Sequence, residues 1–239
     1  MPTPPGGGAV RVNGRRDPSS TPDGRAKLGG ADPALPRKGR PMTRALIVVD
    51  VQKDFCEGGS VPVGGGADRA RAIADLVQGP ERNGWSRVVA TRDHHVDPGG
   101  HFSPDPDFRD SFPVHCVAGS EGGEFHPLFA PAVEAGAVDE VFYKGAHSAS
   151  KSGFEGFTAE GTPMADWLRD QGVDAVDVVG IATDHCVKAT ALDAVKAGFT
   201  TRVLLDYTAG VAADTTDAAL GELGRAGVDL AGTPVVLAG

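Results

Sequence analysis

From Arg44 onward, short runs of mostly apolar, β-branched residues alternate with longer stretches that have the spacing of amphipathic helices. Such runs predict buried strands, and they are ALIVVD (45–50), RVVATRD (87–93), EVFYKG (140–145), VDVVGI (176–181), TRVLLD (201–206) and PVVLA (234–238). Helices are expected between them, over 67–78, 161–172, 184–198 and 214–227. Because strand and helix alternate, the crossovers should be right-handed and the sheet mostly parallel. We expect a single-domain α/β fold with three layers, α/β/α.

The first 41 residues differ in composition from the rest of the chain. They are rich in Pro, Gly, Ser and Arg and have no apolar periodicity, so they bury too little surface to offset the entropy cost of ordering. They carry eight basic and three acidic residues, a net charge of +5, which leaves −14 on residues 42–239. We expect a disordered extension over 1–41, either a solvated tail or a stretch upstream of a true start at Met42, and a folded domain over 42–239.

Charge and cysteine usage narrow the class of protein. The formal charge is −9, which gives no general attraction to nucleic acid. No stretch approaches the ~20 apolar residues of a membrane span. Three widely spaced cysteines without a signal-peptide pattern predict reduced thiols in a cytoplasmic protein. We expect a small-molecule substrate, no nucleic-acid or membrane partner, and a monomer or small homo-oligomer.

Polar residues close or follow four of the predicted strands. Ligands of open α/β sheets bind outside the carboxyl ends of the strands, and the residues found there are Asp50, Asp93, Lys144 and Cys186. Each also has an ordinary interpretation, as a cap, a turn residue, a solvated strand end or a core thiol. Their common position at one rim favours a functional site.

Cys186 follows a predicted strand and begins a predicted helix, with Thr183 or Asp184 as the N-cap. A thiol in the first helical turn has its pKa lowered by the helix dipole. The Lys144 ammonium would stabilise the thiolate, and Asp50 would take the proton and return it to a leaving amine. The N–H of Cys186 and one from the preceding IAT turn would form an oxyanion hole.

A second group of polar residues lies in the long segment 94–139, which is rich in Pro, Gly and His. Imidazole and carboxylate ligands at this density suit one divalent ion of Zn, Fe or Mn; the candidate ligands are Asp93, His95, His101 and His115. His95 is preferred to His94 because alternate residues of an extended chain share a face with Asp93. The alternative is a group of surface-loop histidines.

These residues carry a family resemblance: residues 44–232 resemble the bacterial nicotinamidase/pyrazinamidase group of the isochorismatase-like cysteine hydrolases. The matching segments are ALIVVDVQKDFCEGGSVPV, TRDHHVDPGGHFS, FPVHC, VFYKGAHS and VVGIATDHCV. The resemblance implies the isochorismatase-like hydrolase fold and a cis peptide before Ala182. It also implies a catalytic trio of Asp50, Lys144 and Cys186, and a metal site with four ligands, Asp93, His95, His101 and His115. The oxyanion hole would be formed by Ala182 and Cys186, and Phe55 would form an aromatic wall of the substrate pocket.

The resemblance further implies hydrolysis of nicotinamide to nicotinate and ammonia in NAD salvage, and of pyrazinamide to pyrazinoate, with the metal binding the pyridine nitrogen directly or through water. The chain departs from close relatives at Phe112, a substrate-binding position usually held by Trp, and at Lys151, where an aromatic residue is common. The alternatives are a hydrolase of another amide, an N-carbamoyl compound or isochorismate, a non-catalytic metal-binding module, and a thiol redox sensor that uses Cys186.

Overall fold

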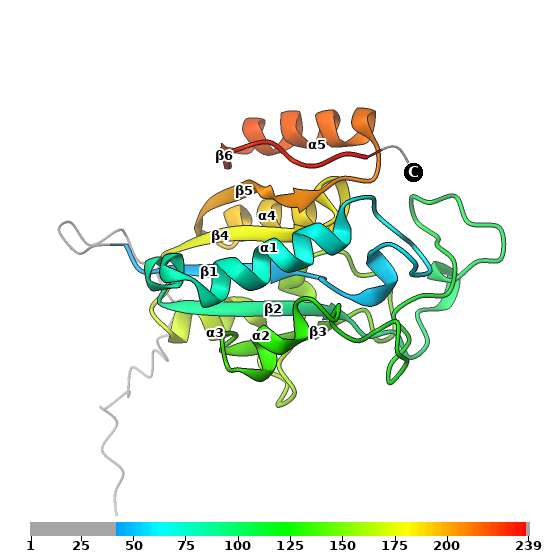
Figure 1. Cartoon of the computed structure of the whole chain (residues 1–239), viewed down its shortest axis with the longest axis horizontal. Coiled ribbons are helices and arrows are strands. Elements are labelled where there is room, and N and C mark those ends of the chain that lie inside the picture. The colour runs from blue at the N-terminus through cyan, green and yellow to red at the C-terminus, as the bar shows by residue number, and fades with distance from the viewer. Residues whose placement is uncertain (1–41, 238–239) are drawn as a thin grey trace, which may run out of the picture. The chain divides into compact units, whose positions relative to one another are not determined.

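The computed structural model describes residues 42–237, and the extension expected over residues 1–41 lies outside them. Six parallel strands form one sheet in the order β3-β2-β1-β4-β5-β6 (Figure 1). Their bounds are β1 Arg44–Val49, β2 Arg87–Asp93, β3 Glu140–Lys144, β4 Ala175–Ile181, β5 Thr200–Ala209 and β6 Asp229–Ala231. The predicted parallel α/β sheet is confirmed.

Helices cover both faces of the sheet, because the central strand β1 is apolar on both sides. Leu46 and Val48 pack in one cluster with α1 (Gly66–Gln78) and α2 (Ala130–Glu134). Ala45, Ile47 and Val49 point to the opposite face and pack in a second cluster. That cluster includes residues of α3 (Met164–Asp170), α4 (Lys188–Lys196) and α5 (Ala213–Arg225). Side chains alternate between the faces of a strand, so β1 lies at the centre of a three-layer fold (Figure 1).

Several predicted boundaries differ from the structure. The predicted last strand, 234–238, is wrong: within the described residues Val235 makes one isolated bridge, and β6 lies earlier, at Asp229–Ala231. The helix expected over 184–198 is divided into a π-helical turn, η5 (Thr183–Val187), and α4. Helix α3 is shorter than the predicted 161–172, and the short α2 was not predicted. In the described part of the chain there are also four 3₁₀ turns, namely η1 (Lys53–Phe55), η2 (Pro80–Gly84), η3 (Gly99–His101) and η4 (Gly153–Glu155).

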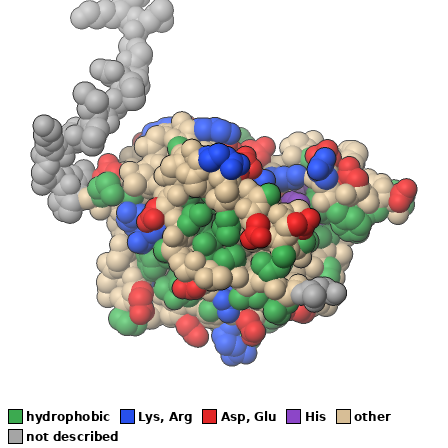
Figure 2. Space-filling view, turned by 90° about the horizontal axis from the view of Figure 1, so that it is seen from above, with side chains coloured by type: hydrophobic (Ala, Val, Ile, Leu, Met, Phe, Trp, Pro, Cys, Tyr) green, Lys and Arg blue, Asp and Glu red, His purple; other side chains and the backbone are tan. Residues whose placement is uncertain are grey.

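Irregular segments of the chain follow the carboxyl ends of the strands and lie at that edge of the sheet. Strand β2 leads into a segment held by isolated bridges between His95 and Val117 and between Phe102 and Phe112. On the face in Figure 2, acidic and basic side chains are interspersed with hydrophobic ones. Within residues 42–237, no helix combines the length and apolar character that a bilayer crossing requires.

Candidate active site and metal centre

Asp50 follows β1 and is held rigidly in the interior. Its side chain is fully buried, and its backbone has a φ of +48°. The Thr91 hydroxyl, from β2, donates to Asp50 Oδ1 over 2.6 Å and accepts from the Asp50 N–H over 3.2 Å. Lys144 Nζ, at the end of β3, lies 2.9 Å from Asp50 Oδ2. The two carboxylate oxygens therefore have different partners from different strands.

Lys144 is the buried cation of the site. Its ammonium donates to Asp93 Oδ1 and lies 3.9 Å from Cys186 Sγ. Burial by itself would lower the pKa of Lys144, but the carboxylates of Asp50 and Asp93 and the Cys186 thiol raise it well above the ordinary value. The ammonium is therefore a permanent positive charge between two acids and the sulfur.

Cys186 is half-buried in the π-helical turn η5, between β4 and α4. Its pKa is raised, first by burial and then by Asp50 and Asp93, and the Lys144 ammonium offsets only part of the rise. The lowered pKa expected from the sequence is therefore wrong. The physical reason is that α4 begins two residues later and the sulfur faces two carboxylates. In the resting site Cys186 is therefore a neutral thiol in the neighbourhood of Asp50.

The two buried carboxyl groups differ in proton affinity. Burial raises the pKa of Asp50, and Lys144 and Thr91 offset part of this rise. Burial also opposes ionisation of Asp93, but Lys144 and His95 lower its pKa well below the ordinary range. When the surroundings push the pKa values of two neighbouring acids apart, the two acids commonly have different roles in proton transfer. Asp50 is the better proton acceptor, and Asp93 is the permanent anion.

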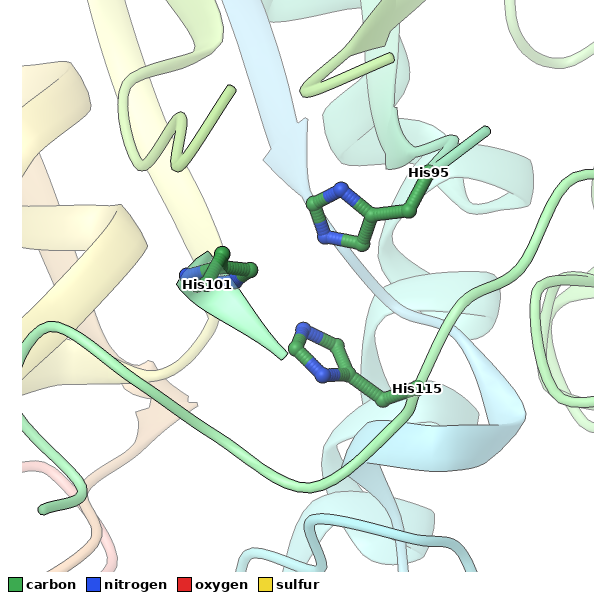
Figure 3. A group of neighbouring side chains, drawn as sticks. All are labelled: His95, His101 and His115. Atoms are coloured by element: carbon green, nitrogen blue, oxygen red, sulfur yellow. The ribbon is translucent and has the colours of Figure 1, made fainter. Parts of the chain in front are cut away.

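Three histidines from different segments surround one point (Figure 3), beside the trio of Asp50, Lys144 and Cys186. Ligand atoms of His95, His101 and His115 all lie within 4.8 Å of one another. Asp93 Oδ2 lies 3.7 Å from His95 Nε2 and 3.9 Å from His115 Nε2. His94 lies elsewhere, with its ring 5.3 Å from that of Tyr143. The structure thus brings the four predicted ligand residues together.

Hydrogen bonds fix the orientation of each imidazole. The Nδ1 atoms of His95, His115 and His101 lie 2.6, 2.7 and 3.2 Å from the backbone oxygens of Gly145, Pro113 and Asp110. A carbonyl only accepts, so each Nδ1 carries the hydrogen and each Nε2 has a lone pair for a cation.

Two further features show that a cation fits the cluster. Within the described residues, His95 Nε2 is buried without a hydrogen-bond partner. Gly145 has a φ of +75°, and a Cβ there would lie 2.7 Å from His95 Cε1, so only glycine leaves room for this ring. Three imidazoles and a carboxylate are a ligand set for a first-row divalent metal. The residues present therefore fit one divalent ion.

A cavity of about 220 Å³ connects the histidines to the thiol. The predicted residues Phe55, Phe112, Ala182 and Cys186 all line it. The peptide bond between Ile181 and Ala182 is cis, as the resemblance implied. A cavity of this size, with aromatic walls and a few convergent polar groups, suits a single small aromatic ring.

The close approach of β4 to β1 beside this cavity depends on one glycine. Gly180 has a φ of +119°, and a Cβ there would lie 2.1 Å from the Val49 oxygen. Only glycine lets β4 approach β1 this closely two residues before Ala182.

Sequence reasoning missed two residues that hold the site. Thr91 positions Asp50, as described above, and Gln52 holds the backbone of Asp93. The Gln52 side chain accepts from Asp93 N over 2.8 Å and donates to Asp93 O over 2.9 Å and to Gly123 O over 2.8 Å. Both are neutral residues, and the only signal in the sequence was their spacing, because each lies two residues from one of the acids: Gln52 from Asp50, and Thr91 from Asp93.

Comparison with known proteins agrees with this geometry. Residues 44–234 match the isochorismatase domain. The nicotinamidase/pyrazinamidase of Mycobacterium tuberculosis is 58% identical over 187 residues, covering 78% of this chain and 97% of the relative.

Two solved structures are similar to the chain. A pyrazinamidase of Pyrococcus horikoshii in complex with zinc has 35% identity and a TM-score of 0.62, covering 78% of this chain and 97% of its own. The L. infantum protein PnC1 in complex with nicotinate has 33% identity and a TM-score of 0.67, covering 79% and 92%. From the domain match and these relatives, the chain belongs to the isochorismatase-domain family of α/β hydrolases.

Proposed function

We propose that this protein is a metal-assisted cysteine amidohydrolase that converts nicotinamide to nicotinate and ammonia, and pyrazinamide to pyrazinoate. The observation that carries the proposal is one small cavity lined by a thiol, a carboxylate and two of three convergent imidazoles. The thiol lies beside a buried acid that can accept its proton. The activities of the relatives support the choice of substrate.

The chemistry starts from the neutral thiol. Cys186 Sγ attacks the carboxamide carbon while its proton passes to the Asp50 carboxylate. When the C–N bond breaks, Asp50 returns that proton to the leaving nitrogen, which departs as ammonia and leaves a thioester. The Lys144 ammonium, 3.9 Å from Sγ, stabilises negative charge on sulfur as it develops.

Water completes the cycle. Asp50 accepts a proton from the attacking water, the C–S bond breaks, and the proton returns to the sulfur. We assign the N–H groups of Ala182 and Cys186 to the oxyanion hole for both tetrahedral intermediates. This assignment is supported by the position of both residues in the cavity wall, on either side of the turn that begins η5.

The histidine cluster would orient the substrate. Asp93, His95, His101 and His115 would hold the ion, which supplies a Lewis-acid site for the pyridine ring nitrogen when bound. Phe55 and Phe112 would contact the ring faces: their own rings lie 5.5 Å from that of His115 and 5.4 Å from that of His101. We propose Zn, Fe or Mn, because imidazole-rich sites with one carboxylate suit these ions.

The test is release of ammonia and nicotinate from nicotinamide by the full chain, with and without a chelator, beside Cys186→Ala. Loss of turnover in both arms, with the fold retained by circular dichroism, is the expected result. Full activity of Cys186→Ala would contradict the mechanism, and a folded, metal-loaded protein without turnover would contradict the substrate.

A further inference from the structure

One basic side chain connects two segments that line the cavity. Lys151 is the only Lys or Arg among the described lining residues, and its ammonium donates to the backbone oxygen of Arg109 over 2.6 Å. Arg109 belongs to the loop 103–111, which follows η3 and contributes Phe108 to the cavity wall. We call this hydrogen bond the latch.

The loop 103–111 is organised internally by one carboxylate. Asp107 Oδ1 accepts from the N–H groups of Arg109, Asp110 and Ser111 over 2.9 Å each. Phe108 lies within this turn with a φ of +54° and is 59% exposed, and its ring stands edge-on to Phe112, 6.3 Å away. These bonds are local, so they hold the loop together as one unit that includes Phe108.

The other end of the latch is anchored. The backbone N–H of Lys151 donates to Glu155 Oε2 over 3.0 Å, and the N–H of Ser152 donates to the same oxygen over 2.8 Å. Ser152 and Glu155 form the capping box of η4. The ammonium of Lys151 therefore extends from a rigid base toward the loop.

The remaining hydrogen bonds of the loop come from its own flanks. Ser103 N–H donates to Phe112 O over 3.0 Å, and His101 Nδ1 lies 3.2 Å from Asp110 O. Within residues 42–237, the latch is the only hydrogen bond that reaches the loop from outside the stretch 101–112. Among the described residues outside 101–112, Lys151 is thus the one that ties the loop carrying Phe108 to the rest of the protein by a hydrogen bond.

We propose that Lys151 is a specificity-determining residue, which limits the size of the amide that reaches Cys186 by holding Phe108 over the cavity. This inference deepens the proposed amidase function and rests on it for the identity of the substrate. The limit on access, in contrast, is a property of the cavity alone and can be measured without turnover.

The first experiment measures access to the thiol. Cys186 is alkylated with a small reagent, iodoacetamide, and a bulky one, fluorescein maleimide, and the modified peptide is quantified by mass spectrometry. In Lys151→Met the bulky-to-small rate ratio should rise about fivefold, the effect that one exposed hydrogen bond exerts on a local equilibrium. Cys56 and Cys116 are buried and serve as internal references.

Two variants complete the design. Lys151→Arg keeps a charged donor and should retain most of the wild-type ratio. Lys196→Met is the matched control, because Lys196 is an exposed lysine whose partner, Asp193, lies on the same helix. It should leave the ratio unchanged. An unchanged ratio in Lys151→Met, or an equal rise in Lys196→Met, would overturn the proposal.

The second experiment measures turnover of nicotinamide and of a larger amide, quinoline-3-carboxamide. Lys151→Met should raise the relative kcat/KM for the larger amide and raise KM for nicotinamide, with kcat within about twofold of the wild type, because the reacting groups are untouched. A wild-type protein without turnover would refute the proposed function and leave the alkylation result to decide the role of Lys151. Unchanged relative kcat/KM in an active variant would overturn the specificity assignment.

Discussion

The Thr91 hydroxyl makes two buried hydrogen bonds to Asp50, and Thr91→Val removes both without changing the shape of the side chain. The bond to Oδ1 is 2.6 Å long and the bond from the Asp50 N–H is 3.2 Å long. Because Thr91 and Asp50 are both fully buried, water cannot replace the lost partner. A buried group left unsatisfied costs about 1–3 kcal/mol, so we expect a loss of about 2–4 kcal/mol in unfolding free energy.

The matched control for this prediction is Thr91→Ser, which keeps the hydroxyl and loses one methyl group. For a domain of this size a loss of about 2–4 kcal/mol lowers Tm by about 5–15 °C. Thermal unfolding of Thr91→Val and Thr91→Ser measures the difference directly. Equal Tm values for the two variants would refute the reasoning, because the hydroxyl would then contribute nothing beyond its packing.

The same substitution predicts a change with pH. Thr91 lowers the pKa of Asp50, which burial raises, so Thr91→Val should raise it further. A carboxyl whose folded pKa is raised contributes stability below its unfolded pKa and loses it as pH rises through the folded pKa. The Tm deficit of Thr91→Val should therefore grow as pH rises above the ordinary carboxyl pKa, through the raised pKa of Asp50. The acid limb of kcat/KM should move to higher pH in parallel.

Three further predictions follow from buried polar groups. Gln52→Leu should weaken metal binding about 10–100-fold, measured by competition with a chelator, because the Asp93 backbone loses two positioning hydrogen bonds and the tie to Gly123 O is lost with them; unchanged affinity would contradict this role. The raised pKa of Cys186 predicts that its alkylation by iodoacetamide keeps accelerating with pH beyond the point where a free cysteine levels off; an early plateau would contradict it. Asp177→Ala should cost about 3–5 kcal/mol, measured by urea unfolding, because two arginines and the Trp85 indole lose a buried partner; kcat should not change.

The strands and the longer helices were predictable because their patterns are local. In a parallel sheet covered on both faces the strands are continuous apolar runs, and five of the six predicted runs became strands. The sixth failed although PVVLA has the same apolar composition, because its described residues, 234–237, lie beside the end of β5 and make a single isolated bridge, from Ala209 to Val235. Helix α2 has five residues, too few to show a helical period.

The positions of the site residues were also largely readable from the sequence. Parallel strands end at one rim, so Asp50, Asp93 and Lys144 were expected on the same edge of the sheet once the strands were recognised. The strand order β3-β2-β1, which makes them neighbours, came from the tertiary structure. Alternation along an extended chain favoured His95 over His94, and the structure places His95 in the cluster. This reasoning needs only the strand pattern.

By itself, the sequence determined the sheet, the rim on which the polar residues gather and the family to which the chain belongs. Only the tertiary structure decided the protonation chemistry, because pKa values depend on burial and on charges that distant segments contribute. Cys186 shows this most clearly: its place before a helix suggested a thiolate, but burial beside two carboxylates makes it a thiol. The Lys151 latch is likewise a contact between segments 42 residues apart, which no local pattern encodes.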